Sequence, residues 1–149
     1  MSIIIEIANK DDLQYVSSLS KEFEKENICY GLIGDEIDHY YDYNVFVAKI
    51  DNKIIGYAYG SFNVKDKDSC SFYKKGDKCF YLEEIYVKNE FRNIGAGSLL
   101  FKAIERYAKE NKAKWFELST STKNYEEVFN FYIKMMKLNY WSSYLIKEL

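Results

Sequence analysis

The sequence predicts an α/β fold of the mixed α+β kind, with a central mixed, mostly antiparallel sheet of about six to seven strands and about four helices. Two observations lead to this prediction. Apolar runs typical of strands alternate with segments of helical periodicity along the 149 residues, and a tight turn joins one pair of strands. Because hairpins are mixed with crossovers, we expect helices on both faces of the sheet.

The first half of the chain contains three expected strands and two expected helices. SIIIEIA is the first strand, and behind it an apolar side chain recurs every three or four residues, as in a helix. These positions are Leu13, Val16, Leu19 and Phe23. Residues 24–43 are acidic and rich in tyrosine, which indicates a loop with a short second helix. NVFVAKI and KIIGYAYGSF are strands, and the DNK between them is typical of a hairpin turn.

The second half begins with a polar loop over residues 64–76, which leads into the strand KCFYLEEIYV. An amphipathic helix follows from Gly97 to Lys109. Its apolar stripe consists of Leu99, Leu100, Ala103, Ile104, Tyr107 and Ala108. KWFELST predicts another strand, residues 125–136 another helix, and LNYWSSYLIKEL, residues 138–149, a closing strand or hairpin arm.

Composition limits the classes of protein to consider. Apolar residues make up 48% of the chain and aromatic residues 18%, which fits one packed domain over residues 1–149. No apolar run approaches the roughly 20 residues that span a bilayer, and no signal peptide is recognisable, so we expect a cytoplasmic protein without a membrane partner. A net charge of −2 gives no support for nucleic-acid binding.

Cysteine and histidine usage indicates neither a metal site nor a nucleophile. The three cysteines form no CxxC pair and have no histidine nearby, so neither a disulfide framework nor a zinc site is expected. His39 is the only histidine. Without a serine or cysteine partner at a motif it does not indicate a catalytic triad, and we leave it out of the predicted site.

The stretch EFRNIGAGSLL places two glycines where a strand ends and a helix begins. Backbone N–H groups at a helix start lie at the positive end of the helix dipole and form an anion site. Gly95 and Gly97 lack side chains that would keep a phosphate away, and Arg92 or the amide of Asn93 can add donors. The spacing R-x-x-G-x-G matches neither a dinucleotide fingerprint nor a Walker loop. A helix entry that leaves room for a neighbouring strand is the alternative.

The strand before these glycines carries two adjacent carboxylates, Glu83 and Glu84. With them, YLEEIYVKNEFRNIGAGSLLFKAIERYA resembles the acetyl-CoA-binding core of the GNAT N-acetyltransferase superfamily, in which a strand L-x-x-I-x-V leads into R/Q-x-x-G-x-G/A and a helix. VFNFYIKMMKLNYW is similar to the family's next helix, with its Phe-Tyr-x-Lys pattern, and NVFVAKIDNKIIGYAYGSF to its hairpin. In motif the chain is closest to the spermidine/spermine-type small-amine acetyltransferases.

This resemblance implies a GNAT-like fold, acetyl-CoA (coenzyme A) as cofactor and a role for each matching residue. Glu83 matches the base that takes the proton of the amine, directly or through water, and Tyr132 matches the acid that protonates the leaving CoA thiolate. The backbone of Ile85, Tyr86 and Val87 would hold the acetyl carbonyl and the pantetheine arm. The pyrophosphate would lie on Arg92, Asn93, Ile94, Gly95, Ala96, Gly97 and Ser98. Asn124, one residue before the position of the family's asparagine, is also assigned to the cofactor.

Two features of this match leave alternatives open. Glu84 points to the opposite face of a regular strand, whereas a β-bulge, which is common at this strand in the family, would bring both glutamates to the cleft. Met136-Lys137 stands where the family usually has glycine and an aromatic residue, so this helix must end differently. A solvated carboxylate remains the alternative for Glu83 and Glu84, and a core tyrosine for Tyr132.

The acceptor is predicted from charge. Residues 21–43 hold seven acidic residues, two lysines and four tyrosines, a local net charge of −5. Acids attract a polyamine or an aminoglycoside, and tyrosine faces hold ammonium groups. The acceptor candidates are therefore Glu84, Glu26, Tyr30 and Asp35. A peptide or protein amine is the alternative acceptor, and a solvated helix face is the alternative reading of the charges.

A non-catalytic acyl-CoA-binding sensor of the same fold is the rival from another functional class. Glu83 together with Tyr132 favours the enzyme. The apolar side chains of residues 138–149 indicate a homodimer if they are exposed, and they could equally close the core.

Overall fold

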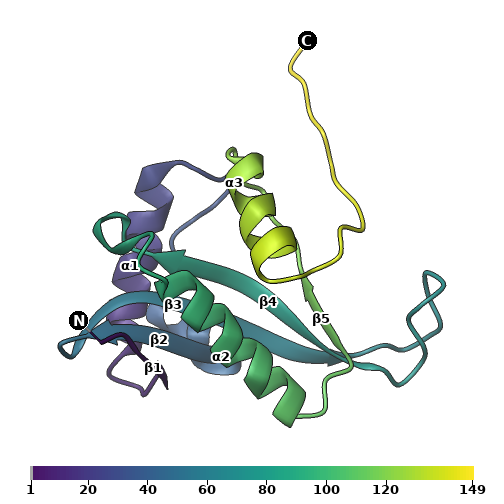
Figure 1. Ribbon diagram of the computed structural model, residues 1–149, viewed down its shortest axis with the longest axis horizontal. Helices are drawn as coiled ribbons and strands as arrows, with labels where there is room; N and C mark the ends of the chain where they lie inside the picture. Colours follow the sequence, from purple (N-terminus) through teal and green to yellow (C-terminus); the bar gives the residue numbers. More distant parts are fainter. Residues whose placement is uncertain (1) are drawn as a thin grey trace.

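The computed structural model describes residues 2–149, and one five-stranded sheet forms its centre (Figure 1). The strands are β1 (Ile4–Ile7), β2 (Asn44–Ile50), β3 (Lys53–Val64), β4 (Lys78–Val87) and β5 (Trp115–Leu118). They lie in the order β1-β2-β3-β4-β5. All neighbours are antiparallel except β4 and β5, which are parallel. The predicted mixed, mostly antiparallel sheet is confirmed, with five strands in place of six or seven.

Helices cover both faces of this sheet, as predicted. Helix α1 (Leu13–Glu26) packs on one face and helix α2 (Ala96–Glu110) on the other, each over its own apolar core. The short 3-10 helices η1 (Ile37–Asp42) and η2 (Asn89–Phe91) lie in the connections. Helix α3 (Tyr125–Phe129) continues into a π-helical turn, η3 (Asn130–Met135), above the end of the sheet near β5 (Figure 1).

The hairpin between β2 and β3 forms where the sequence predicts it. Asp51 and Asn52 have φ angles of +48° and +62°. Two successive residues with positive φ are the signature of the turn whose twist matches that of paired strands, and aspartate and asparagine tolerate that conformation well. Beyond the turn the register shifts by one residue, because Lys49 lies opposite Ile54 and Ala48 opposite Gly56.

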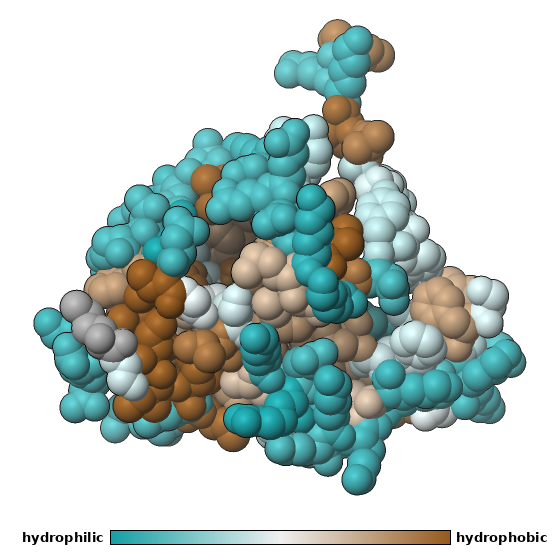
Figure 2. Space-filling model, in the orientation of Figure 1, coloured by the Kyte–Doolittle hydropathy of each residue, from teal (hydrophilic) through white to brown (hydrophobic). Residues whose placement is uncertain are grey.

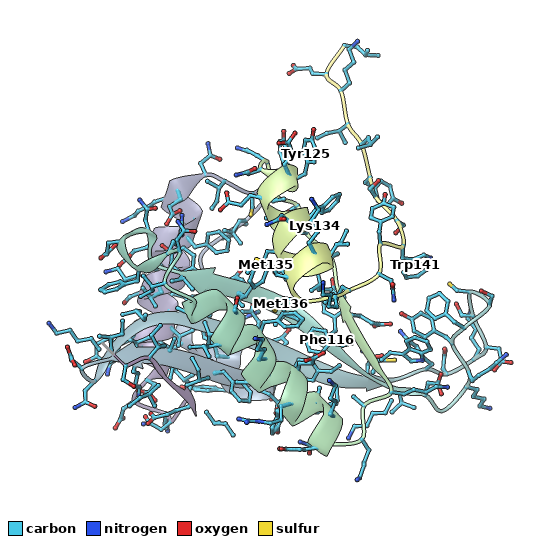
Figure 3. The ribbon with its side chains drawn as sticks, in the orientation of Figure 1. Phe116, Tyr125, Lys134, Met135, Met136 and Trp141 are labelled. Carbon is cyan, nitrogen blue, oxygen red and sulfur yellow. The ribbon has the colours of Figure 1, made fainter. Side chains whose placement is uncertain are left out.

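The last twelve residues, 138–149, form no strand, so this part of the prediction is wrong. Trp141 packs against Phe72, with ring centroids 5.5 Å apart, and the chain then leaves the body of the protein (Figures 1 and 3). Tyr144 and Leu145 are 100% and 92% exposed. An apolar run forms a strand only where a sheet edge accepts its backbone, and in residues 2–149 this segment pairs with no strand.

Candidate active site

The edge of β4 that faces away from β3 opens half-way along the strand. β4 pairs with β3 along its whole length, but with β5 only from Cys79 to Leu82. β5 ends at Leu118, opposite Leu82, whereas β4 continues to Val87. Strand backbone without a partner can bind an extended ligand as an added strand. The stretch of β4 without a β5 partner contains Ile85, Tyr86 and Val87, the residues predicted to hold the pantetheine arm.

A β-bulge lies at the point where this edge opens. Tyr59 is opposite Glu84 and Gly60 is opposite Leu82, so Glu83 is the extra residue on β4. The bulge reverses the alternation of side chains beyond it. Glu84 therefore lies on the α1 face together with Tyr57 and Tyr59, in place of the α2 face that a regular strand would give it.

The two glutamates of the bulge have different surroundings. Glu83 is exposed, and its pKa is raised by partial burial while the nearby His39 works against this rise. Glu84 is half-buried and accepts a hydrogen bond from the hydroxyl of Tyr57. Burial, together with the charges of Asp35 and Glu83, raises the pKa of Glu84 to about 7, although the Tyr57 hydrogen bond lowers it. Such a carboxylate can both accept and release a proton near neutral pH.

The predicted phosphate loop forms the start of helix α2. Gly95 is the residue before the helix and has a φ of +92°, a conformation that favours glycine. The first backbone bond into the helix runs from Leu99 N–H to the Gly95 carbonyl at 3.0 Å, so the preceding amides have no acceptor within the helix. A Cβ on Gly97 would lie 3.8 Å from the ring of Phe131, which is ordinary contact. Neither φ nor packing therefore requires a glycine at position 97.

The surface beside this loop is hollowed and includes an exposed apolar side chain (Figure 2). Ile94 is 52% exposed at the loop although its side chain is apolar. Figure 2 shows the surface hollowed between the start of helix α2 and helix α3, close to the end of β4. The loop amides, the absent side chain at Gly97 and the open edge of β4 thus fit a phosphate-bearing ligand with an extended arm.

Arg92 and Glu26, predicted to bind cofactor and acceptor respectively, bind each other. The guanidinium Nη2 of Arg92 donates to both carboxylate oxygens of Glu26, at 2.8 and 2.7 Å. The hydroxyl of Tyr86 donates to Glu26 at 2.6 Å, and Nε of Arg92 donates to the carbonyl of Val87 at 2.9 Å. These contacts tie the end of α1 to the phosphate loop and to β4.

Tyr132 lies in the π-helical turn η3 and packs against helix α2, with its ring centroid 6.1 Å from that of Phe101. Burial raises the pKa of the Tyr132 phenol, so the group keeps its proton at neutral pH, as an acid must. In residues 2–149 the hydroxyl has no side-chain hydrogen-bond partner, and it is not among the fully enclosed polar atoms that lack a partner, so it keeps some contact with solvent.

The turn that ends η3 shows how the chain manages without the glycine that the family usually has after this helix. Met136 N–H donates to the carbonyl of Phe131 at 2.9 Å, which closes a wide π-turn. Lys137, with a φ of +65°, then takes the left-handed position that glycine usually fills. Met136 lies over helix α2 and packs against its core (Figure 3).

Two other predicted residues have partners within the chain. The side chain of Asn124 caps helix α3 and donates to Glu127 at 2.6 Å. Tyr30 is 56% exposed, and the ammonium of Lys123 lies 5.2 Å from the centre of its ring. Their backbones belong to two segments that pair with each other: Tyr30 N–H donates to the carbonyl of Ser121 at 2.9 Å.

Asp35 lies in a group of polar side chains that the sequence alone did not reveal. The hydroxyl of Tyr59 donates to Asp35 at 3.3 Å, and His39 lies 3.5 Å from the same carboxylate and 3.1 Å from Tyr59. The sequence analysis therefore did not assign His39, Tyr57 and Tyr59 to the site. The alternation in YAY places both tyrosines on one face of β3, but only the bulge shows that Glu84 shares this face.

The comparison with protein families agrees with this geometry. Residues 6–135 match the acetyltransferase (GNAT) family. The chain belongs to the GNAT acetyltransferase family. As a member it is an N-acetyltransferase, and its acetyl donor is acetyl-CoA, for which the loop amides and the edge of β4 provide the fitting donors. No curated protein matches the sequence, and no helix in residues 2–149 is long and apolar enough to cross a membrane.

Solved structures of GNAT proteins share the fold at low sequence identity. A ribosomal-protein-alanine N-acetyltransferase from Brucella melitensis biovar Abortus 2308 is 17% identical, with a TM-score of 0.73 over 99% of this chain and 100% of that one. The aminoglycoside acetyltransferase meta-AAC0020, from an uncultured soil metagenomic sample, is 18% identical, with a TM-score of 0.73 over 99% and 96%. The aminoglycoside N-acetyltransferase AAC(6')-Iy, in complex with CoA, is 19% identical, with a TM-score of 0.69 over 99% and 95%.

Proposed function

We propose that this protein, as one catalytic domain over residues 1–149, acetylates a primary amine of a small cationic acceptor such as a polyamine or an aminoglycoside. The observation that carries this proposal is the set of carboxylates around Tyr43. Asp42 directly precedes Tyr43 in the chain, and the Tyr43 ring packs against Tyr59 with ring centroids 5.0 Å apart. The Tyr59 hydroxyl in turn donates to Asp35 at 3.3 Å. Burial, together with the charges of Glu83, Asp35 and Asp42, raises the pKa of the Tyr43 phenol. Several carboxylates beside a tyrosine ring favour an ammonium group.

Residues 21–43 keep carboxylates that no lysine or arginine of the chain neutralises, and these are available to such an acceptor. Four of the seven acids are neutralised by a lysine or an arginine or bound by a backbone amide: Glu22 with Lys88, Glu24 with the Gly34 amide, Glu26 with Arg92, and Glu36 with Lys21. Asp35 has the side chains of Tyr59 and His39 as its partners. In residues 2–149, neither Asp35 nor Asp42 forms an ion pair with a lysine or an arginine. A ligand cation can therefore supply the missing positive charge.

The chemistry we propose is direct attack of the amine on the thioester. A carboxylate of the Glu83–Glu84 pair takes the proton from the amine, a role that the family resemblance gives to Glu83. Tyr132, which keeps its proton at neutral pH, donates it to the leaving sulfur. Bound acetyl-CoA supplies the activated acetyl group. The amides at the start of α2 would bind its phosphates, and the edge of β4 would orient its arm.

Thiol release from acetyl-CoA tests this function against a panel of spermidine, aminoglycosides, amino acids and lysine-bearing peptides. Turnover with the polycations alone is the expected result, with a KM that rises with salt as the charges are screened. Asp42→Asn should raise that KM, whereas Glu36→Gln, which loses only a surface ion pair with Lys21, should not. Turnover with peptides alone would favour a protein amine as acceptor. CoA binding without any turnover would favour a sensor.

We also propose that two copies associate through their C-terminal segments. Tyr144, Leu145 and Ile146 are at least 79% exposed, and a group of exposed apolar side chains is typical of a contact surface. Light scattering of the full chain and of a chain that ends at Trp141 tests this, since only the full chain should be dimeric. A monomeric full chain would contradict the proposal.

The proposed location is the cytoplasm. Cys29, Cys70 and Cys79 form no disulfide in the described chain, which suits a reducing compartment. Fractionation of cells that express the tagged protein is the direct measurement.

A further inference from the structure

Glu84 holds its carboxylate in a fixed position on the α1 face of the sheet. Its Oε1 accepts the hydrogen bond from Tyr57, whose side chain is completely buried, with 0% exposure. The second oxygen has no hydrogen-bond partner in residues 2–149. An enclosed polar atom without a partner occurs only once among the side chains of these residues, at the hydroxyl of Tyr40. Because Oε2 of Glu84 also lacks a partner, it must be in contact with solvent. One oxygen is thus held by Tyr57, while the other is free of protein partners in the described residues and in contact with solvent.

We propose that Glu84, rather than Glu83, takes the proton of the acceptor amine, and that Tyr57 is the positioning residue that holds its carboxylate. This inference rests on the proposed acetyl transfer and names the base within it. Glu84 directly precedes Ile85, where the open edge of β4 would hold the acetyl group, so the base and the reacting carbon would share one short stretch of strand.

The surroundings of Glu83 suit this role less well. In the described chain no hydrogen bond or ion pair holds its side chain, and the residue is exposed. An exposed, unrestrained carboxylate must lose side-chain entropy before it reaches a productive geometry. Glu83 is better suited to attract the ammonium group beside Asp35 and Tyr43.

The proton balance of the reaction requires a group that is reset in each turnover. The C–N bond forms as the C–S bond breaks, and the electron pair of the C–S bond leaves with sulfur. The ammonium acceptor loses two protons. One of them is taken by Glu84 and released to water. The other, passed through solvent, restores the proton that Tyr132 would give to the CoA thiolate, so both groups return to their starting state. A base that titrates near neutral pH can complete this cycle.

The groups that face Glu84 come from several elements. They are Tyr57 and Tyr59 of β3, Tyr40 of η1, Asp35 before η1, Cys29 after α1, and Glu83 beside it. The three tyrosines have a pKa raised by burial, and so does the Cys29 thiol, so all four stay neutral at pH 7. The charged neighbours Asp35 and Glu83 are acidic, and His39 of η1, whose Nε2 lies 3.5 Å from Asp35, adds a positive charge beside them when it is protonated. No lysine or arginine in residues 2–149 forms an ion pair with Glu84 that would hold it ionised at low pH.

The matched variants Glu84→Gln and Glu83→Gln test the assignment in the full-length protein with a polyamine acceptor. Loss of a general base lowers turnover by about 10²–10⁴-fold. We expect this loss in kcat for E84Q with CoA binding retained, and a change in KM rather than in kcat for E83Q. NMR titration of protein labelled with ¹³C-glutamate, with the Glu84 carboxyl resonance identified by its absence in E84Q, should give a midpoint near 7.

Tyr57→Phe separates positioning from folding. The Tyr57 hydrogen bond lowers the pKa of Glu84. In a plot of kcat/KM against pH, Y57F should therefore shift the rising limb to higher pH by about one unit. The control is Tyr107→Phe, which also removes a tyrosine hydrogen bond, 2.9 Å to Asn44, but lies on the α2 face. Y107F should leave the limb in place.

Three outcomes would count against these proposals. If E84Q keeps full kcat while E83Q loses it, the base is Glu83 and this assignment falls alone. A Glu84 midpoint near the ordinary glutamate value would likewise overturn the assignment. If the wild-type protein acetylates no amine although it binds CoA, the proposed function itself fails.

Discussion

Replacing Gly97 by alanine separates what the fold needs at the phosphate loop from what the ligand needs. A Cβ at this position meets Phe131 at 3.8 Å and Val87 at 4.0 Å, so it fits without displacing either. Alanine is favoured over glycine by about 1 kcal/mol within a helix, and by about half of that in the first turn. Gly97→Ala should therefore leave the free energy of unfolding unchanged or raise it by about 0.5 kcal/mol.

The same substitution should weaken CoA binding. The added methyl group lies beside the amides that would contact the pyrophosphate, so we expect the Kd for CoA to rise at least tenfold, a loss of about 1.4 kcal/mol. Urea unfolding without ligand and calorimetric titration with CoA measure the two quantities on the same sample. A Gly97→Ala protein that binds CoA as tightly as the wild type would refute the placement of the phosphates at this loop.

Gly95→Ala is the matched control, because it should destabilise the fold through backbone strain, whereas Gly97→Ala should weaken ligand binding without destabilising the fold. A Cβ on Gly95 would have nothing within 4 Å, but the residue has a φ of +92°. An L-residue in a left-handed conformation costs about 1–2 kcal/mol. We therefore expect G95A to be destabilised in the absence of ligand, whereas G97A is not.

Two further predictions follow from other contacts. Glu26→Gln should lower the free energy of unfolding by about 1 kcal/mol, because Arg92 loses a partly exposed ion pair, and should leave the acceptor KM unchanged; a raised KM in the thiol-release assay would restore Glu26 to the acceptor site. Tyr40→Phe removes a buried hydroxyl without a hydrogen-bond partner and should raise stability to urea by about 1 kcal/mol, whereas destabilisation would indicate a bound water.

The sequence predicts best those elements whose signal is local. The DNK turn, helix α2 and the strand before the glycines each depend on residues within one element, and all three form where the sequence predicts them. The predicted apolar stripe of α2 is right in part, since Leu99 is exposed and Phe101 is buried in its place. The pairing of Glu26 with Arg92 joins residues 66 positions apart, and no local pattern indicates which of the many acids this arginine binds. The C-terminal segment fails for a related reason, since its apolar pattern does not specify a partner strand.

The bulge at Glu83 is the feature on which the candidate site depends most, and its cause lies on the neighbouring strand. A Cβ on Gly60 would lie 2.2 Å from the carbonyl oxygen of Tyr81, so only glycine permits β3 and β4 to approach this closely. The register shifts immediately beside this contact. A glycine in GYAYGSF indicates a close approach somewhere along the strand, but not which residue of the partner becomes the extra one.

One irregularity then accounts for both halves of the site. The ladder between β4 and β5 ends at Leu82, the residue directly before the bulge, so the open edge begins where the register shifts. The same shift places Glu84 on the α1 face of the sheet, where the hydroxyl of Tyr57 donates a hydrogen bond to it. A regular β4 would instead direct Glu84 into the apolar core under helix α2, where an unpaired carboxylate is strongly disfavoured. The geometry that would receive the acetyl group and the geometry of the proposed base thus have a common origin in a single extra residue.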